Sequence, residues 1–340
     1  MGRQTTRADV ARLAGVSTAD VSYVVNGGPR GVSPQARAKV ERAIEQLGYR
    51  PNANARALRT GSSGLVGVIV PEVINAFFAE FVEALDEAAH PHNKSILLAV
   101  THERAERESE LVWSLVDRGV DAMVFASYLQ DERLYTAGGS SISRVFLDRS
   151  FPSAGCTTIG ADYTRGARDI TNHLADHGHR RIAYIGGPLP RTPLDLRRAA
   201  WDEVLRERRL PRVEPAITSW DREGGYEGVR RLMALPEPPT AIFAASDFIA
   251  IGALRALHEL GLRIPEDVAV ASFDGTAESA YSWPSLTTVR QPFATMAADT
   301  MDLISDPRSA THHLSEPMDL IIRSSCGCTP TSHPTVTRPS

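Results

Sequence analysis

The chain has few cysteines and no long apolar stretch. Its three cysteines, Cys156, Cys326 and Cys328, are too few and too unevenly spaced for a disulfide framework. No run approaches the roughly 18 consecutive apolar residues that a membrane-spanning helix needs. The first residues, MGRQTTRADV, also lack the apolar segment of a secretory signal. We therefore expect a chain that works in the reducing cytoplasm and has no membrane partner.

Motifs of catalysis and metal binding are also missing. The sequence has no phosphate-binding glycine loop, no GxSxG motif and no Ser/His/Asp arrangement. His173, His177 and His179 lie in HLADHGH, which lacks the glutamate of an H-E-x-x-H zinc motif. Cys326-Gly327-Cys328 lacks a second cysteine pair. We therefore expect structural roles for these residues, with no metal site, no cofactor and no enzymatic activity.

The formal net charge of -4 conceals an asymmetry along the chain. Residues 1–60 contain ten basic and four acidic residues, a balance of +6, so the remaining residues carry -10. A basic head on an acidic body is typical of a protein whose head alone contacts a polyanion. The alternative is a charge-rich head that is simply solvated.

Residues 1–50 predict three short helices. For the first helix, Thr6 is the capping residue, Asp9 follows three positions later and Gly15 closes the helix. The second begins at Ser17, again with an acidic residue, Asp20, three positions later. The third begins at Ser33 with Pro34 in its first position and ends at Gly48. Only three residues, 15–17, separate the first two helices, and so short a turn imposes the sharp crossing of a helix-turn-helix. Val21, Val24 and Val25 form an apolar stripe that packs on the first helix. A three-helix interaction module without a DNA role is the alternative.

The segment PNANARALRTG at 51–61 predicts a further short helix. Pro51 ends the preceding helix, Asn52 can cap a new one and Gly61 closes it. Barely two turns are too short to be stable alone in water. The segment would therefore fold against a symmetry mate or against DNA. An ordinary interdomain linker is the alternative.

From Leu65 onward, short apolar strands alternate with amphipathic helices. One series has strands at 65–70, 95–100, 121–126 and 143–148 and helices at 77–90 and 104–118. A second has strands at 157–162, 181–187, 216–219, 241–246 and 268–274, a helix ending at 177, and helices at 195–208, 222–234 and 247–260. Such alternation predicts parallel sheets covered on both faces. Two doubly wound subdomains would bind a ligand in the cleft at the carboxyl ends of their strands.

The order of these blocks resembles that of the LacI/GalR (lac repressor) family of bacterial transcriptional regulators over about residues 5–325. The matching blocks include TRADVARLAGVSTADVSYVVNG, VSPQARAKVERAIEQLGYRPNANARALRTG, DHGHRRIAYIGGP and PSLTTVRQP. The resemblance implies an all-α helix-turn-helix head and a hinge helix, joined to a periplasmic-binding-protein-like α/β sensor of two doubly wound subdomains. The expected domains are the head at 1–50, the hinge at 51–63, the effector-binding and dimerisation domain at 64–325, and a disordered tail at 326–340.

The resemblance also implies which residues contact DNA. The family's base-reading positions correspond to Thr18, Ala19, Ser22 and Tyr23. Residues at backbone-contacting positions and in the hinge complete the set: Ser17, Asn26, Ser33, Arg37, Asn52, Ala55 and Leu58. Leu58 matches the leucine that the family inserts into the minor groove, usually at a central CG step. Many members have arginine at position 23, so tyrosine there implies a different operator sequence.

In the sensor, ten residues correspond to positions at or beside the family's effector cleft: Phe77, Phe78, Ser127, Asp148, Arg191, Arg197, Trp220, Asp247, Asp274 and Gln291. Aromatic faces beside Asp and Arg suit a sugar, whose C–H faces pack on rings and whose hydroxyls form charge-assisted bonds with charged groups. We expect Arg197 to reach from the first lobe's side or from the crossing, Asp274 from the second lobe, and Trp220 to offer a stacking face between them.

The implied function is that of a homodimeric repressor, cytoplasmic and associated with the nucleoid. It would bind a palindromic double-stranded DNA operator with a central CG step, under the control of a small effector, a sugar or related polyol. An effector that is a phosphorylated sugar, a nucleobase or a partner protein stays open, as does, from another class, a sugar-binding transport protein. The tail lacks the leucine heptads of a tetramerising coiled coil.

Overall fold

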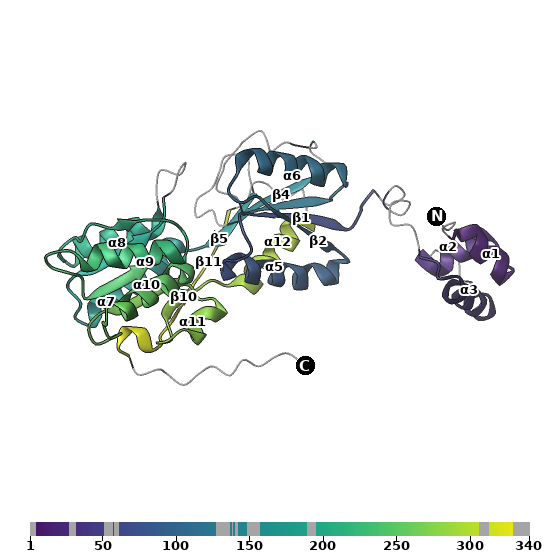
Figure 1. Cartoon of the computed structure of the whole chain (residues 1–340). Helices are drawn as coiled ribbons and strands as arrows, with labels where there is room; N and C mark the ends of the chain where they lie inside the picture. Colours follow the sequence, from purple (N-terminus) through teal and green to yellow (C-terminus); the bar gives the residue numbers. More distant parts are fainter. Residues whose placement is uncertain are drawn as a thin grey trace. The chain divides into compact units, whose positions relative to one another are not determined.

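The computed structural model describes residues 5–26, 32–50, 57, 61–126, 137, 139, 142–147, 157–188, 195–305 and 313–328. The chain divides into two compact units, residues 1–63 and 64–340, drawn in Figure 1. Within the described ranges, none of the helices combines the length and apolar character needed to cross a membrane.

The smaller unit contains the three predicted helices, α1 (Arg7–Ala14), α2 (Thr18–Asn26) and α3 (Pro34–Leu47). In α1 the Asp9 amide donates to the Thr6 hydroxyl while the Asp9 carboxylate accepts from the Thr6 amide, which completes a capping box. Ser17 and Asp20 repeat this exchange at α2. Gly15 and Gly48, with φ of 65° and 58°, end α1 and α3 in the left-handed conformation that favours glycine.

The apolar stripe of α2 packs as the sequence predicts. Val21 is fully buried in a small core with Val10 of α1 and Val40 of α3, and Val24 and Val25 pack against this core. The short turn at 15–17 therefore holds α2 across α1, with its polar side facing away from the core.

The first lobe of the larger unit is a parallel six-stranded sheet in the order β11-β5-β4-β3-β1-β2. Its strands are β1 (Leu65–Val70), β2 (Ser95–Val100), β3 (Ala122–Phe125), β4 (Ser143–Leu147), β5 (Thr157–Ala161) and β11 (His313–Glu316). Its helices are α5 (Ala76–Ala89), followed by the short turn η1 (His90–His92), α6 (Ala105–Asp117) and α12 (Phe293–Ser305). Helix α6 covers one face of the sheet, and α5 with α12 covers the other (Figure 1).

The second lobe repeats this plan with the sheet order β12-β10-β9-β8-β6-β7, in which β12 alone is antiparallel to its neighbour. Its strands are β6 (Ile182–Gly186), β7 (Ala216–Ile217), β8 (Ala241–Ala244), β9 (Ala269–Asp274), β10 (Thr287–Arg290) and β12 (Asp319–Ile321). Its helices are α7 (Tyr163–Asp176), α8 (Leu196–Glu207), α9 (Arg222–Met233), α10 (Asp247–Glu259), α11 (Ala277–Tyr281) and η3 (Ser324–Cys326). The predicted class of two doubly wound subdomains is confirmed.

The division between the lobes differs from the prediction at one strand. The sequence series placed strand 157–162 at the start of the second subdomain, but β5 pairs with β4 in the first sheet, with Val145 opposite Thr157. An apolar run predicts a buried strand without indicating which sheet it joins, because strand pairing depends on the connections. The first series therefore ends one strand later than expected.

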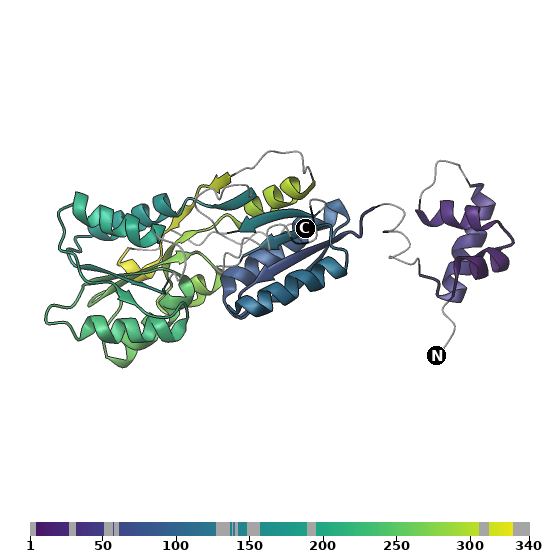
Figure 2. The same ribbon diagram turned by 90° about the horizontal axis from the view of Figure 1, so that it is seen from above.

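The chain passes between the lobes at residues 161–163, 290–293 and 316–319 in the part of the unit that the structure describes, and Figure 2 shows the two lobes side by side. The Glu80 carboxylate of α5 also accepts a hydrogen bond from the Ala277 amide at the start of α11, at 2.7 Å. The lobes can thus change their arrangement only about these few connections, as in hinged binding proteins.

The packed part of the chain extends further than we expected. The sequence predicted a disordered tail from residue 326, whereas Cys326 is buried at 1% exposure and Cys328 is half-buried. The buried Ser325 explains the difference, since its hydroxyl donates to Val270 O of β9 at 2.6 Å. Residues 329–340 lie outside the described part of the chain.

Candidate functional site

The polar side of α2 is a candidate surface for contacting DNA. Ser17, Thr18 and Ala19 at its start are exposed, and Ser22 and Tyr23 one turn later are half-buried. Small exposed residues at a helix start allow its end to approach base edges in a major groove. Four of these five residues are polar, and the helix N-terminus adds a partial positive charge.

The two serines assigned to DNA-backbone contacts act as helix caps in this structure. The Ser17 hydroxyl donates to the Asp20 carboxylate at 2.7 Å, and the Ser33 hydroxyl accepts from the Ala36 amide at 3.2 Å. Arg37 is exposed and lies 3.9 Å from Glu41, a solvent-screened pair worth well under about 1 kcal/mol. Its guanidinium can therefore exchange that carboxylate for a phosphate at little cost.

Four predicted DNA contacts cannot be placed from the structure. Asn52, Ala55 and Leu58 lie outside the described residues, as does the side chain of Asn26. Of the expected hinge helix, Ala57 is described as helical, and its carbonyl accepts from the Gly61 amide at 2.8 Å.

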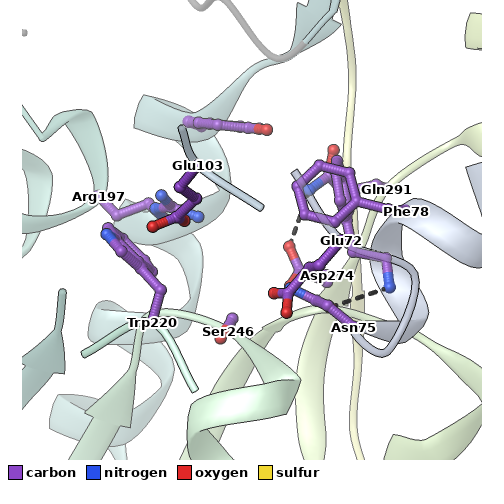
Figure 3. Close-up of a pocket in the computed structure, with 11 residues that line it drawn as sticks. Glu72, Asn75, Phe78, Glu103, Arg197, Trp220, Ser246, Asp274 and Gln291 are labelled. Carbon is purple, nitrogen blue, oxygen red and sulfur yellow. Dashed lines mark hydrogen bonds between the residues drawn. The ribbon is translucent and has the colours of Figure 1, made fainter. Parts of the chain in front are cut away.

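The larger unit has a cleft between its lobes, with an empty volume of about 410 Å³ that includes its opening to solvent. Eleven residues line it: Glu72, Asn75, Phe77, Phe78, Glu103, Tyr163, Arg197, Trp220, Ser246, Asp274 and Gln291. Figure 3 shows Arg197 and Trp220 on one side, facing Asp274, Gln291 and Phe78 on the other.

The structure brings six of the ten predicted effector residues into this cleft: Phe77, Phe78, Arg197, Trp220, Asp274 and Gln291. Ser127, Asp148 and Arg191 lie outside the described residues. Asp247 is described but does not line the cleft. Sequence reasoning missed Glu72, Asn75, Glu103, Tyr163 and Ser246. Most of these residues lie within three positions after the carboxyl end of a strand. Ligands of parallel sheets bind at these strand ends, so this rule could have identified them from the sequence.

Arg197 is held in place by aromatic rings. Its guanidinium carbon lies 4.8 Å from the centroid of the Trp220 ring and 5.2 Å from that of Tyr163, within cation–π range. It also donates to the Ala245 carbonyl at 3.2 Å. Because α8 packs on α7 and β6, Arg197 comes from the second lobe, so the expectation that it reaches from the first lobe or the crossing is wrong. Arg197 itself, rather than a ligand, stacks on Trp220.

Asp274 and Gln291 form one rigid unit. Asp274 has a φ of 107° at the end of β9, a conformation that costs a non-glycine residue about 1–3 kcal/mol and is typical of functional sites. The next residue must be glycine, because a Cβ at Gly275 would come within 2.5 Å of the Arg290 backbone. The Gln291 side-chain amide donates to Asp274 Oδ1 at 2.8 Å. This bond orients the Gln291 amide and leaves its oxygen as an acceptor.

Two buried polar atoms in the cleft lack a hydrogen-bond partner among the described residues. They are Oε1 of Gln291 and the hydroxyl of Tyr163, whose side chains are 2% and 5% exposed. Both residues sit where the chain passes between the lobes. An unpaired buried polar group costs about 1–3 kcal/mol, which a ligand hydroxyl would recover by bonding to it. A ligand that carries hydroxyl groups could satisfy both atoms.

The charge of the described cleft is predominantly negative. The carboxylates of Glu72, Glu103 and Asp274 line it together with one guanidinium, that of Arg197. Burial and then the charge of Glu103 raise the pKa of Glu72, as expected where carboxylates share a partly desolvated space. An anionic ligand would add to this repulsion, whereas a neutral polyol would not.

Asp247 lies beneath the cleft, where it joins three elements. Its carboxylate accepts from the Ser272 hydroxyl at 2.5 Å, from the Thr288 hydroxyl at 3.0 Å, and from the Thr276 amide and hydroxyl at 2.7 and 2.9 Å. Burial raises its pKa and these hydrogen bonds oppose that rise. With four bonds accepted, the carboxylate positions β9, β10 and the start of α11 rather than holding a ligand.

Asp247→Ala is expected to destabilise the larger unit by about 3 kcal/mol, because it leaves the Ser272, Thr276 and Thr288 donors buried without an acceptor. Urea unfolding of the purified chain measures this loss. Glu227→Ala is the matched control, since its exposed pair with Arg231 at 3.1 Å is worth about 0.3–0.5 kcal/mol. Equal unfolding midpoints for the two variants would contradict the structural role of Asp247.

Comparison with known proteins identifies both units. Residues 6–52 match the family described as bacterial regulatory proteins, lacI family, and residues 171–326 match the periplasmic binding protein-like domain. The chain is 37% identical to the HTH-type transcriptional regulator GalS of Salmonella typhimurium, over 87% of each chain. A lac repressor dimer bound to operator and the anti-inducer ONPF matches with a TM-score of 0.86 and 28% identity, over 95% of this chain and 99% of that one. The CelR–cellobiose complex matches with a TM-score of 0.69 and 28% identity, over 95% and 100%.

Proposed function

The chain belongs to the lacI family of bacterial regulatory proteins, and from this premise we propose that it is a homodimeric repressor whose operator affinity is set by a neutral sugar or related polyol. We assign the DNA-binding head to residues 1–50, the hinge to 51–63 and the effector-binding and dimerisation domain to 64–325. It acts in the cytoplasm at the nucleoid, where its operators lie.

The observation that carries the choice of effector is the pair of buried, unpaired polar atoms, Gln291 Oε1 and the Tyr163 hydroxyl. A sugar supplies several hydroxyls, each of which can donate and accept, so it satisfies both atoms at once. Phe77 and Phe78 offer apolar surface for its C–H faces. The similar CelR structure holds a sugar, cellobiose.

A phosphorylated sugar is the principal competing effector, with Arg191 and Arg197 as its binding cations. The described lining opposes it, because Glu72, Glu103 and Asp274 outnumber the Arg197 guanidinium. A nucleobase or a partner protein would bring fewer hydroxyl groups into the cleft than a sugar and would form fewer hydrogen bonds to Gln291 Oε1 and the Tyr163 hydroxyl.

The operator is an imperfect palindrome with a central CG step, where Leu58 of each protomer inserts into the minor groove. One helix-turn-helix reads too few base pairs for specificity in a genome, so two heads act on two half-sites. The similar lac repressor was solved as a dimer on its operator. Two hinge segments, each too short to be stable alone, then support one another on the DNA.

The effector acts by selecting one arrangement of the lobes. A ligand that contacts Phe78 in the first lobe and Asp274 in the second favours the arrangement in which both reach it. It changes operator affinity only by its differential affinity for the two arrangements, a coupling of about 1–3 kcal/mol in typical cases.

Within the head, Tyr23→Ala is expected to change which base is preferred in each half-site, since we assign Tyr23 to base reading. Arg37→Ala is expected to weaken all sites alike and to reduce the salt dependence by about one phosphate contact. Fluorescence anisotropy with operators varied one base pair at a time, at two salt concentrations, measures both effects. A uniform loss across all sequences for Tyr23→Ala would show that Tyr23 does not read bases.

A thermal-shift screen of the purified chain tests the effector class. Neutral sugars and polyols are compared with sugar phosphates and purines at equal concentration. We expect stabilisation by at least one neutral sugar, because a ligand at 100 times its Kd adds about 2.7 kcal/mol to the stability of its binding unit. Stabilisation by phosphorylated compounds or purines alone would refute the assignment.

A further inference from the structure

Four side chains of metal-binding chemistry meet on the second lobe, outside the cleft. His173 and His177 lie one turn apart near the end of α7, with ring centroids 4.6 Å apart. Cys326 ends η3 and Cys328 follows it after Gly327. The two pairs could not be joined from the sequence, because about 150 residues separate them and each alone is an incomplete motif.

Short distances link these side chains. Cys328 Sγ lies 3.0 Å from His177 Nε2 and 3.7 Å from His173 Nε2, and Cys326 Sγ lies 3.3 Å from His173 Nε2. The ligand atoms of His173, His177 and Cys328 all lie within 4.8 Å of one another, and Cys326 adjoins this group of three through His173. With Zn–N near 2.0–2.1 Å and Zn–S near 2.3 Å, a tetrahedron places N and S ligands about 3.6 Å apart. Small shifts of the side chains would therefore suffice to surround one ion.

The backbone around the cysteines presents both sulfurs to the histidines. Gly327 has a φ of 90°, and this left-handed turn directs the flanking residues toward α7. The Thr287 hydroxyl of β10 donates to Cys326 Sγ at 3.0 Å, the kind of outer contact that fixes a metal-ligand thiolate. Asp176, which lies between the histidines in sequence, pairs with Arg208 at 2.6 Å and so stays out of the cluster.

We propose that His173, His177, Cys326 and Cys328 bind one Zn²⁺ ion, which ties the segment at residues 324–328 to the end of α7. Two sulfur and two nitrogen ligands in tetrahedral arrangement favour zinc over the hard cations, which prefer oxygen. Four protein ligands leave no open position, so the site is structural. It is independent of the proposed repressor function, since none of its residues lines the cleft or belongs to the head.

Zinc binding by the full chain tests this proposal. The protein is purified without a histidine tag, stripped of metal and kept fully reduced, and Zn²⁺ is titrated in competition with a chromophoric chelator. We expect one Zn²⁺ per chain with a Kd below about 1 μM, in line with four-ligand structural sites. Co²⁺ in place of Zn²⁺ should give the intense visible bands of tetrahedral cobalt and a sulfur-to-cobalt charge-transfer band.

The variants Cys328→Ser and His177→Ala identify the ligands. Both residues are at least partly exposed, so the fold should tolerate the changes. We expect each to weaken Zn²⁺ binding more than about 100-fold, beyond the 10- to 100-fold effect of losing an outer-shell partner. His179→Ala is the control, because that ring bonds to Thr240 instead at 3.1 Å. Failure of the reduced chain to bind one Zn²⁺, or unchanged binding by both ligand variants, would overturn the site.

Discussion

Asp274→Ala is expected to abolish the effector response while leaving operator binding near that of the wild type. Asp274 lines the cleft in a strained conformation and holds the Gln291 amide at 2.8 Å. Its loss removes a charge-assisted bond to the sugar and also frees Gln291 to turn away. One such bond is worth about 1.5–3 kcal/mol, so effector affinity should fall about 10- to 100-fold.

Arg197→Ala should give the same loss of response, because Arg197 lines the cleft from the other side. Isothermal calorimetry with the stabilising sugar, together with operator binding with and without it, separates ligand affinity from DNA affinity. Arg198→Ala is the matched control, since its neighbouring guanidinium does not line the cleft. A wild-type response at unchanged sugar concentration in either cleft variant would place the effector site elsewhere.

Replacing both Tyr281 and Trp283 by aspartate is expected to convert the proposed dimer into monomers. These side chains are 89% and 94% exposed at and just after α11, and we assign them to the dimer surface. Ile74, which precedes α5, and Leu98 on the edge strand β2 are exposed at 66% and 45%. Two charges in a dimer interface remain unpaired and desolvated, at a cost that exceeds the apolar gain.

A monomer should bind the operator on the order of 1,000-fold more weakly or worse, because one head retains only one half-site. Light scattering gives the assembly state and anisotropy gives the operator affinity. Trp113→Asp is the control: this tryptophan, 52% exposed on α6, lies on the other side of the first sheet from α5. A double variant that stays dimeric at micromolar concentration would refute the surface, and a stable wild-type tetramer would refute the expectation of a simple dimer.

Local signals in the sequence predicted the elements well. Capping residues such as Thr6 and Ser17 and closing glycines such as Gly15 act within one turn, so their outcome depends little on the rest of the chain. The apolar runs likewise gave the buried strands from β1 to β9 within a few residues. The elements after residue 274, from α11 onward, were not predicted; among them, β12 is only half-buried and carries no continuous apolar signal.

The sequence did not predict how the elements are arranged relative to one another in the fold. Strand β5 was assigned to the wrong lobe, and Arg197 to the wrong side of the cleft, because both depend on how the chain passes between the sheets. Asp247 sits directly beside the cleft residue Ser246, yet its side chain faces inward to Thr276 and Thr288. The histidine pair of α7 and the cysteine pair at the end of η3 are seen to lie together only in the folded structure.

The most direct test of the account is the operator affinity of the wild-type chain measured across a panel of neutral sugars, with the same panel run on Asp274→Ala. We expect at least one neutral sugar to change the operator Kd of the wild type by about 5-fold or more, the usual range of such couplings, and we expect this change to be lost in the variant. No change with any neutral sugar, together with a change caused by a phosphorylated sugar or a purine, would contradict it.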